Sequence, residues 1–202
     1  MNNIAMAMSV EPITLEGAHI RLAPLSMAHH AQLCEIGLDE RLWRSTTIQL
    51  QTSEDMFKYI QTALQNQAEG NALPFVIIEK DSDKLVGTTR YHSINRAHRR
   101  LEIGFTWIAV EWQRTRVNTE AKYLMLKHAF EQCRCVRVEF KADSSNQQSS
   151  RALIRIGAKQ EGVLRKYMVS DHKGARDLAL FSIIDTEWPA VKAYLEMKLT
   201  SR

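Results

Sequence analysis

The chain has 202 residues, of which 45% are hydrophobic and 25% charged, a composition typical of one globular domain with its own core. The formal net charge of +4 is small for a dedicated nucleic-acid binder, and no run of about eighteen apolar residues indicates a membrane span. We therefore expect neither a nucleic-acid partner nor a membrane, and the mild positive charge favours an anionic ligand.

The cysteines and the N-terminus bear on the compartment. Three cysteines include Cys133 and Cys135, which are too close together for a usual metal or redox motif. An odd number of cysteines fits a reducing compartment better than a disulfide framework, so we expect a cytoplasmic protein and no metal site. The first residues lack the basic start and long apolar core of a secretion signal. We expect residues 1–12 to form a flexible segment and residues 13–199 a single domain.

The first half of the chain is expected to contain a strand, two helices and three strands. Ser26 and Thr52 or Ser53 are suitable N-caps for the two helices, and Asp81-Ser82-Asp83 suits a tight hairpin turn. The predicted elements are His19 to Leu25, Ser26 to Leu38, Thr52 to Gly70, Phe75 to Glu79, Lys84 to Ile94 and Leu101 to Ala109.

The second half begins with the strongest helical pattern, Asn118 to Cys133, whose apolar residues recur three and four positions apart. Strict alternation then predicts a strand from Cys135 to Lys141. The remaining expectations are a helix from Ser149 to Ile156, a hairpin of Glu161 to Val169 and Asp177 to Ile184 around Asp171-His172-Lys173-Gly174, and a helix from Thr186 to Leu199. Hairpins at both ends and a central strand-helix-strand crossover predict a mixed architecture.

Several chemistries lack their usual signatures. The eight glycines form neither a Rossmann spacing nor a P-loop, and no Gly-x-Ser-x-Gly elbow is present. His92 and His98 are too loosely spaced for a metal motif, and we interpret them as surface or structural groups. The basic residues at 96–100 leave open an RNA-associated interaction domain, although a solvated loop is favoured because no aromatic platform accompanies them.

Two arginines lie at the start of the predicted helix from Asn118. A helix N-terminus carries about half a positive charge, so a cation there costs about 0.3 to 1 kcal/mol unless water and salt screen it. Either Arg114 and Arg116 point into solvent, or an anion occupies the free N–H groups and the arginines add charge-assisted hydrogen bonds to it. The residues alone leave both readings open.

Short segments on both sides of this joint occur in the order found in a known superfamily. They are Val86 to Tyr91, Leu101 to Gly104, Gln113 to Lys122, Val138 to Lys141, Asn146 to Leu153, Gly157-Ala158 and Glu161-Gly162. Together they resemble the GCN5-related N-acetyltransferase (GNAT) superfamily, in the subgroup similar to the ribosomal-protein alanine N-acetyltransferases (RimJ/RimL-like), over Ile13 to Leu199. The resemblance implies an α/β (α+β) acyl-CoA N-acyltransferase fold, with a mixed, mostly antiparallel twisted sheet flanked by helices.

The resemblance also implies a site for acetyl-CoA. Gln113 to Asn118 is similar to the family's (Gln/Arg)-x-x-Gly-x-(Gly/Ala) loop, with Arg116 and Asn118 in place of the usual small residues. The groups expected to hold the pyrophosphate are the backbone N–H groups of Arg114, Arg116, Val117, Asn118 and Thr119. The main chain of Trp107, Ile108 and Ala109 would pair with the pantetheine arm as an added strand. Asn146 would orient the pantetheine or a water, unless it only forms a turn.

By the same resemblance, the protein is an enzyme that moves the acetyl group of acetyl-CoA directly to a primary amine. Glu102 is the expected proton acceptor, with a pKa raised by partial burial, although a surface glutamate is an equal alternative. No tyrosine occurs in Ala152 to Arg155, where much of the superfamily has one, so Ser149 is the expected general acid; helix capping is its alternative. The weaker candidates for the acceptor pocket are Trp43, Arg90, Tyr91 and Tyr167.

The acceptor is the least determined part. The subgroup implies a protein or peptide N-terminal amine, and a polyamine, an amino acid or an amine antibiotic remains open because a fold does not determine a substrate. The altered loop and the missing tyrosine also leave open a catalytically silent acyl-CoA-binding protein. We expect a monomer or a homodimer.

Overall fold

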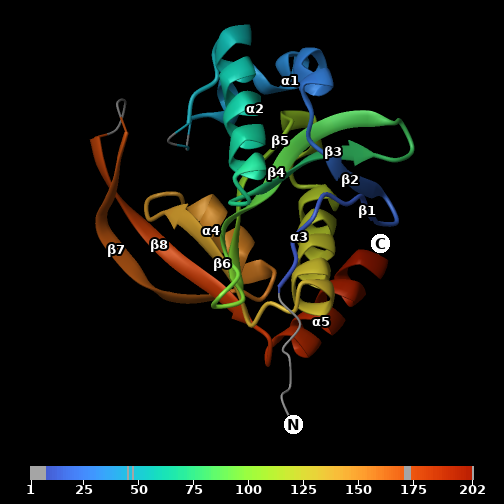
Figure 1. Ribbon diagram of the computed structural model, residues 1–202, viewed down its shortest axis with the longest axis vertical. Helices are drawn as coiled ribbons and strands as arrows, with labels where there is room; N and C mark the ends of the chain where they lie inside the picture. Colours follow the sequence, from blue (N-terminus) through green and yellow to red (C-terminus); the bar gives the residue numbers. More distant parts are fainter. Residues whose placement is uncertain (1–7, 45, 47, 171–173, 202) are drawn as a thin grey trace.

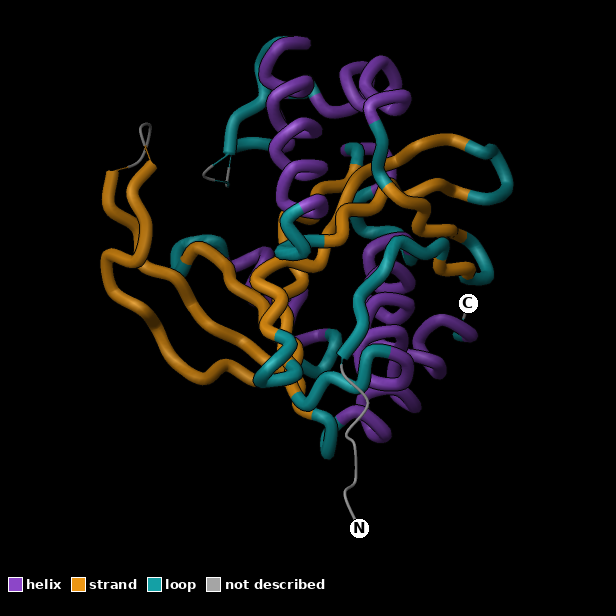
Figure 2. The backbone as a smooth tube through the Cα atoms, in the orientation of Figure 1, coloured by secondary structure: helices purple, strands orange, loops and turns teal. Residues whose placement is uncertain are grey.

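A single eight-stranded sheet forms the centre of the molecule (Figures 1 and 2). The computed structural model describes residues 8–44, 46, 48–170 and 174–201. The strands are β1 Leu15–Glu16, β2 Ile20–Pro24, β3 Leu73–Glu79, β4 Lys84–Asn95, β5 Arg100–Ile108, β6 Arg137–Asp143, β7 Lys159–Ser170 and β8 Gly174–Ile184. Their order across the sheet is β1-β2-β3-β4-β5-β6-β8-β7. All neighbours are antiparallel except β5 and β6, which are parallel because the crossover between them contains a helix.

Within the described ranges, five α-helices cover the sheet. They are α1 His30–Gly37, α2 Ser53–Ala68, α3 Val117–Lys127, α4 Gln147–Arg155 and α5 Trp188–Thr200. Short 3-10 turns lie at Met27–His29, Glu40–Leu42 and Val110–Trp112, and α3 continues as a π-helical turn over His128–Gln132. A capping box starts α2: the Thr52 hydroxyl accepts from the Asp55 N–H at 3.1 Å, and the Asp55 carboxylate accepts from the Thr52 N–H at 2.9 Å.

The helices divide the core between the two faces of the sheet. Leu33 of α1 and Met56 and Ile60 of α2 belong to one buried cluster. Ala121 of α3 and Leu195 of α5 belong to the other, larger cluster. Figure 1 accordingly shows α1 and α2 on one side of the central strands and α3 and α5 on the other. A ligand that crosses the sheet would therefore have to pass between strands.

The pairing between β5 and β6 is short. Only Arg100, Leu101 and Glu102 of β5 pair with β6, although β5 continues to Ile108. Beyond Glu102 the two strands separate, and the arm formed by β6, β8 and β7 turns away from the rest of the sheet (Figure 1). The described part of the chain offers no strand partner to this edge of β5, so its main chain is open to an extended ligand.

The expected fold class is confirmed, and each expected helix and strand is present with ends displaced by a few residues. The two-residue strand β1 has no sequence signal and was not expected, because so short a segment shows no periodicity. The expected turn at residues 171–173 lies outside the described residues. Met8 and Val10, which precede the expected start of the domain at Ile13, are buried in the larger core. No described helix is both long and apolar enough to cross a membrane.

Candidate active site

A β-bulge in β5 shapes the middle of the sheet. Thr88 of β4 pairs with Trp107 and Arg90 pairs with Gly104, so β5 has one residue more than β4 between these pairs. Phe105 in this bulge adopts a left-handed conformation with φ of 50°. Bulges redirect side chains, and the ring of Phe105 lies against Arg90. The bulge thus places an aromatic ring beside the point where β5 leaves β6.

A buried carboxylate lies at that same point. Glu102 is 4% exposed, and its carboxylate contacts His92 of β4 (Oε1 to Nε2, 3.3 Å) and Lys141 of β6 (Oε2 to Nζ, 2.9 Å). Lys141 also donates to the hydroxyl of Tyr167 at 3.3 Å. A Cβ on Gly104 would come within 2.5 Å of His92 Nε2, so this glycine leaves room for the imidazole to lie across β5. Four side chains from four strands therefore form one connected network.

The network sets the charge of Glu102. Burial raises the pKa of its carboxyl, but the hydrogen bonds and charges of His92 and Lys141 outweigh burial, and the pKa lies below its ordinary value. The expected raised pKa is therefore wrong, because the sequence did not show these two partners. Burial lowers the pKa of Lys141, and the contacts with Glu102 and Tyr167 raise it overall. Glu102 is an ionised carboxylate at neutral pH, and by itself a weak base for an ammonium ion.

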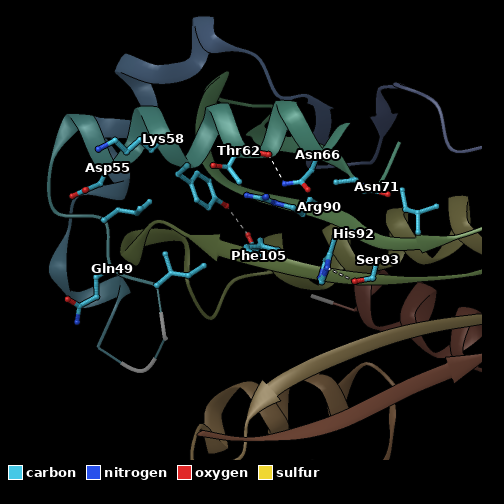
Figure 3. A pocket seen from close by; sticks show the side chains of 15 residues that line it. Gln49, Asp55, Lys58, Thr62, Asn66, Asn71, Arg90, His92, Ser93 and Phe105 are labelled. Carbon is cyan, nitrogen blue, oxygen red and sulfur yellow. Dashed lines mark hydrogen bonds between the residues drawn. The ribbon is translucent and has the colours of Figure 1, made fainter. Parts of the chain in front are cut away.

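A pocket of about 590 Å³ lies beside this network, between α2 and strands β4 and β5 (Figure 3). Its volume is in the range of small-molecule sites. The side chains that line its inner wall include Tyr59, Thr62 and Asn66 of α2, Arg90 and His92 of β4, and Phe105 of β5. Glu102 does not line the pocket, whereas His92 does, so the carboxylate meets the pocket through the imidazole.

On the other face, the loop before α3 is open. Arg114, Thr115 and Arg116 are exposed. The N-cap residue Arg116 makes no side-chain capping hydrogen bond, and the hydroxyl of Thr115 accepts from the N–H of Val117 at 3.3 Å. Its first N–H groups beyond Val117, which are those of Asn118 and Thr119, therefore lack a capping acceptor.

The two arginines of this loop differ in conformation. The left-handed backbone, φ of 60°, occurs at Arg114, whereas Arg116, at the position where the family prefers glycine, has an ordinary φ of −71°. The guanidinium of Arg116 contacts Nε2 of His19 at 2.7 Å, and the imidazole must be the acceptor because arginine only donates. The bulky residue at position 116 therefore strains no backbone, and its guanidinium lies against His19, the residue before β2.

The open edge of β5 leads from this loop toward Glu102. The N–H of Ala109 donates to the carbonyl of Val86 on the β4 side, at 2.8 Å. Since hydrogen-bonding groups alternate along an antiparallel strand, those of Ile108 face away from β4. The Ile108 carbonyl accepts from Gln113 Nε2 at 3.1 Å. Among the residues expected to pair with pantetheine, Ala109 therefore has its N–H engaged with β4. The N–H of Ile108 points away from β4, and its carbonyl is engaged by Gln113.

Two expected residues lie at the start of α4. Asn146 is the N-cap of α4, and its side chain accepts from the N–H of Ser149 at 3.0 Å. The structure thus gives Asn146 a capping role. Ser149 is half-buried in the first turn, and its hydroxyl makes no hydrogen bond within the described residues. No contact joins Ser149 to the Glu102 network in that part of the chain.

The four weaker candidates for the acceptor pocket lie in different surroundings. Trp43 is buried against Trp107 and donates its indole N–H to the Gly37 carbonyl at 2.8 Å, and Tyr91 is fully buried and donates its hydroxyl to the Met125 carbonyl at 2.6 Å. Neither lines the pocket, because a strand or loop position does not reveal which face a side chain takes. Arg90 lines the pocket, and Tyr167 reaches the network through Lys141.

The sequence reasoning missed His92, Tyr59 and Phe105. His92 was interpreted as a surface or structural group, although it lies directly opposite Glu102 in the β4–β5 register. Only the pairing of the two strands brings His92 opposite Glu102, because cross-strand neighbours are distant in sequence. The described residues contain no cluster of three or more His, Cys, Asp or Glu side chains that could hold a metal ion.

A sheet opened beside an uncapped helix, with a pocket on its opposite face, defines a fold of the acyl-CoA N-acyltransferase type. Residues 19–159 match the family model described as an acetyltransferase (GNAT) domain. The match spans more than half of the chain, and the protein belongs to this GNAT acetyltransferase family.

Individual relatives agree with this assignment. The chain is 29% identical over 119 residues to the uncharacterized N-acetyltransferase YoaA of Bacillus subtilis (strain 168), covering 59% of this chain and 67% of YoaA. A GCN5-related N-acetyltransferase from Brucella melitensis superposes with a TM-score of 0.87 at 28% identity, over 95% of this chain and 87% of that one. Mycobacterium smegmatis RimJ in complex with CoA-disulfide gives a TM-score of 0.79 at 23% identity, over 93% and 95%, and shares the fold.

Proposed function

We propose that this protein transfers the acetyl group of acetyl-CoA to a primary amine that enters the pocket under α2. The observation that supports this most is the open edge of β5, which leads from the uncapped start of α3 to the Glu102 network and the pocket. Donor and acceptor would thus meet from opposite faces of the sheet. The complex of RimJ with CoA-disulfide, which shares this fold, supports a CoA thioester as the donor.

The donor would be held by charge and by main chain. The N–H groups at residues 114 and 116–119 would bind the pyrophosphate, with the exposed guanidinium of Arg114 adding a charge-assisted hydrogen bond. The main chain of Ile108 would pair with the pantetheine arm as an added strand. Trp107 would contribute only its backbone, since its side chain is buried in the core cluster that contains Leu33 of α1 and Met56 of α2.

Proton removal would use the half-buried His92 and the buried Glu102 together. An amine must be neutral before its nitrogen attacks the thioester carbonyl, and a free amine is mostly protonated at neutral pH. Because the Glu102 carboxylate is ionised and only accepts, Nε2 of His92 carries its hydrogen toward Glu102 and leaves Nδ1 as the basic atom. Nδ1 lies 3.1 Å from the Ser93 hydroxyl at the pocket (Figure 3). We assign proton acceptance to His92 and stabilisation of the imidazolium to Glu102.

The reaction then ends with the loss of CoA. The new N–C bond forms, the C–S bond breaks, and the thiolate takes a proton to leave as CoA thiol. Ser149 is our proposed donor of that proton, on the support of its unengaged hydroxyl in the first turn of α4.

The setting of the reaction is also a proposal. The subgroup resemblance favours an N-terminal amine of a protein or peptide, and small amines are the alternative. The three cysteines are free, two of them buried, which supports a reducing compartment such as the cytoplasm.

Two measurements test the proposed function. Acetyl-CoA at one hundred times its Kd should raise the stability of the protein by about 2.7 kcal/mol, measured as a rise in melting temperature. Thiol release across a panel of peptides and small amines then measures turnover. The absence of any shift at millimolar acetyl-CoA would refute CoA binding, and a shift without thiol release for any amine would instead identify a silent acyl-CoA-binding protein.

A further inference from the structure

A buried cation without an ionic partner lines the acceptor pocket. Arg90 is 4% exposed, yet none of the described residues forms a salt bridge or hydrogen bond with its guanidinium. Its contacts are with two aromatic rings, at 4.1 Å from the centroid of Phe105 and 4.8 Å from that of Tyr59. Arginine stays charged at physiological pH, and a buried charge without a counterion is costly. An anion bound beside the guanidinium would offset this cost.

The surroundings of Arg90 are built to hold it there. Its partners across the strands are Pro74 of β3 and Gly104 of β5, neither of which has a polar side chain to pair with the guanidinium. Tyr59 is held in place by its hydroxyl, which lies 3.0 Å from Thr88 Oγ1. The guanidinium is thus clamped between two rings, and Figure 3 shows it directed along the floor of the pocket under α2.

The other charged groups of the pocket are already engaged. The carboxylate of Asp55 accepts from the N–H groups of Gln51 and Thr52 at the start of α2. Lys58 pairs with Glu54 at 3.3 Å. The negative charge of Glu102 is matched by Lys141 and His92. Within the described lining, Arg90 therefore supplies the positive charge that remains uncompensated.

We infer that Arg90 binds a carboxylate of the amine acceptor, so that the preferred substrate carries a carboxylate a few bonds from the amine that is acetylated. His92 and Arg90 both pack on the ring of Phe105, the first at 5.0 Å between centroids, so the two groups flank one ring. The imidazole would receive the amine while the planar guanidinium fork receives the carboxylate. This inference rests on the proposed acetyl transfer. It covers both a free amino acid and a peptide with an acidic residue next to its N-terminus.

Matched acceptors test the inference directly. Thiol release from acetyl-CoA is measured with alanine against alaninamide, and with the amidated peptides Ala-Asp-Gly-Gly against Ala-Asn-Gly-Gly. We expect kcat/KM to be about 10- to 100-fold higher for the carboxylate member of at least one pair, as expected for a hydrogen-bonded charge. A preference within the alanine pair identifies the α-carboxylate of a free amino acid, and a preference within the peptide pair identifies an acidic side chain next to the N-terminus. Equal kcat/KM within both pairs would overturn the inference while leaving acetyl transfer intact, whereas inactivity with every amine would refute the proposed function itself.

A variant then assigns the preference to Arg90. Arg90→Met keeps the length and loses the charge, so it should lower kcat/KM for the carboxylate member to the value for the amide member and abolish the preference. Arg155→Met, which removes an exposed arginine on α4, is the control and should change neither. Because the charge has no ionic partner, Arg90→Met should also melt at or above the temperature of the unmodified protein. A lower melting temperature with equal losses for both acceptors would show that Arg90 is structural and overturn the inference.

Discussion

The buried amine of Lys122 in α3 predicts how the stability of the protein changes with pH. The side chain is 5% exposed, and Nζ donates to Thr106 Oγ1 at 2.6 Å. Burial lowers the pKa of this ammonium from 10.5 to about 7. In the unfolded chain the amine has its ordinary pKa, so between these two values the unfolded state binds more protons than the folded state. The contribution of Lys122 to stability therefore increases with pH across this window.

The size of the effect follows from the two pKa values. Each unit of difference corresponds to about 1.4 kcal/mol, so raising the pH from 6 to 9 should increase the stability of the protein by about 2 to 3 kcal/mol through this group. Lys122→Met should remove that slope and stabilise the protein most at pH 6. The partner hydroxyl is not stranded by the change, because Thr106 Oγ1 also lies 2.7 Å from Thr89 Oγ1.

Urea unfolding at pH 6, 7, 8 and 9 measures the effect as the difference in free energy of unfolding between the two proteins. Lys127→Met, at an exposed lysine of the same helix, is the matched control and should follow the unmodified protein at every pH. Parallel curves for Lys122→Met and the unmodified protein would refute the reasoning, since they would mean that Lys122 titrates alike in both states.

Three further predictions concern the proposed reaction. His92→Gln and Glu102→Gln should each lower kcat by about 100-fold or more while acetyl-CoA still raises the melting temperature; full activity of His92→Gln would mean that the carboxylate acts without the imidazole. Ser149→Ala should lower kcat and leave the helix cap in place, because only the backbone of Ser149 takes part in the cap; unchanged kcat would remove it as the acid. Arg114→Gly should relieve the left-handed backbone and leave stability unchanged or higher by about 1 kcal/mol, yet raise the KM for acetyl-CoA. Arg99→Gly, also left-handed and exposed, should not alter this KM.

The order of elements and the resemblance to the family were readable from the sequence because they depend on local patterns. Alternation along β6 and the three-and-four spacing along α3 are periodicities of neighbouring residues. The opening after Glu102 was not readable in this way. It depends on how far two strands separated by the whole of α3 continue to pair, and no local pattern records that.

The same distinction explains what became of the candidate residues. The sequence offered Glu102 as a candidate base, but the charge of its carboxyl is set by His92 and Lys141, which come from strands ten and thirty-nine positions away. It placed Trp43 and Tyr91 in the pocket, whereas the packing of the two cores turned both inward. The sequence by itself determined the order of the helices and strands and the resemblance to the family, because both depend on residues close together in the chain. The tertiary structure decided which of them share a face and a charge environment, because burial and the energy of a charge depend on neighbours in space.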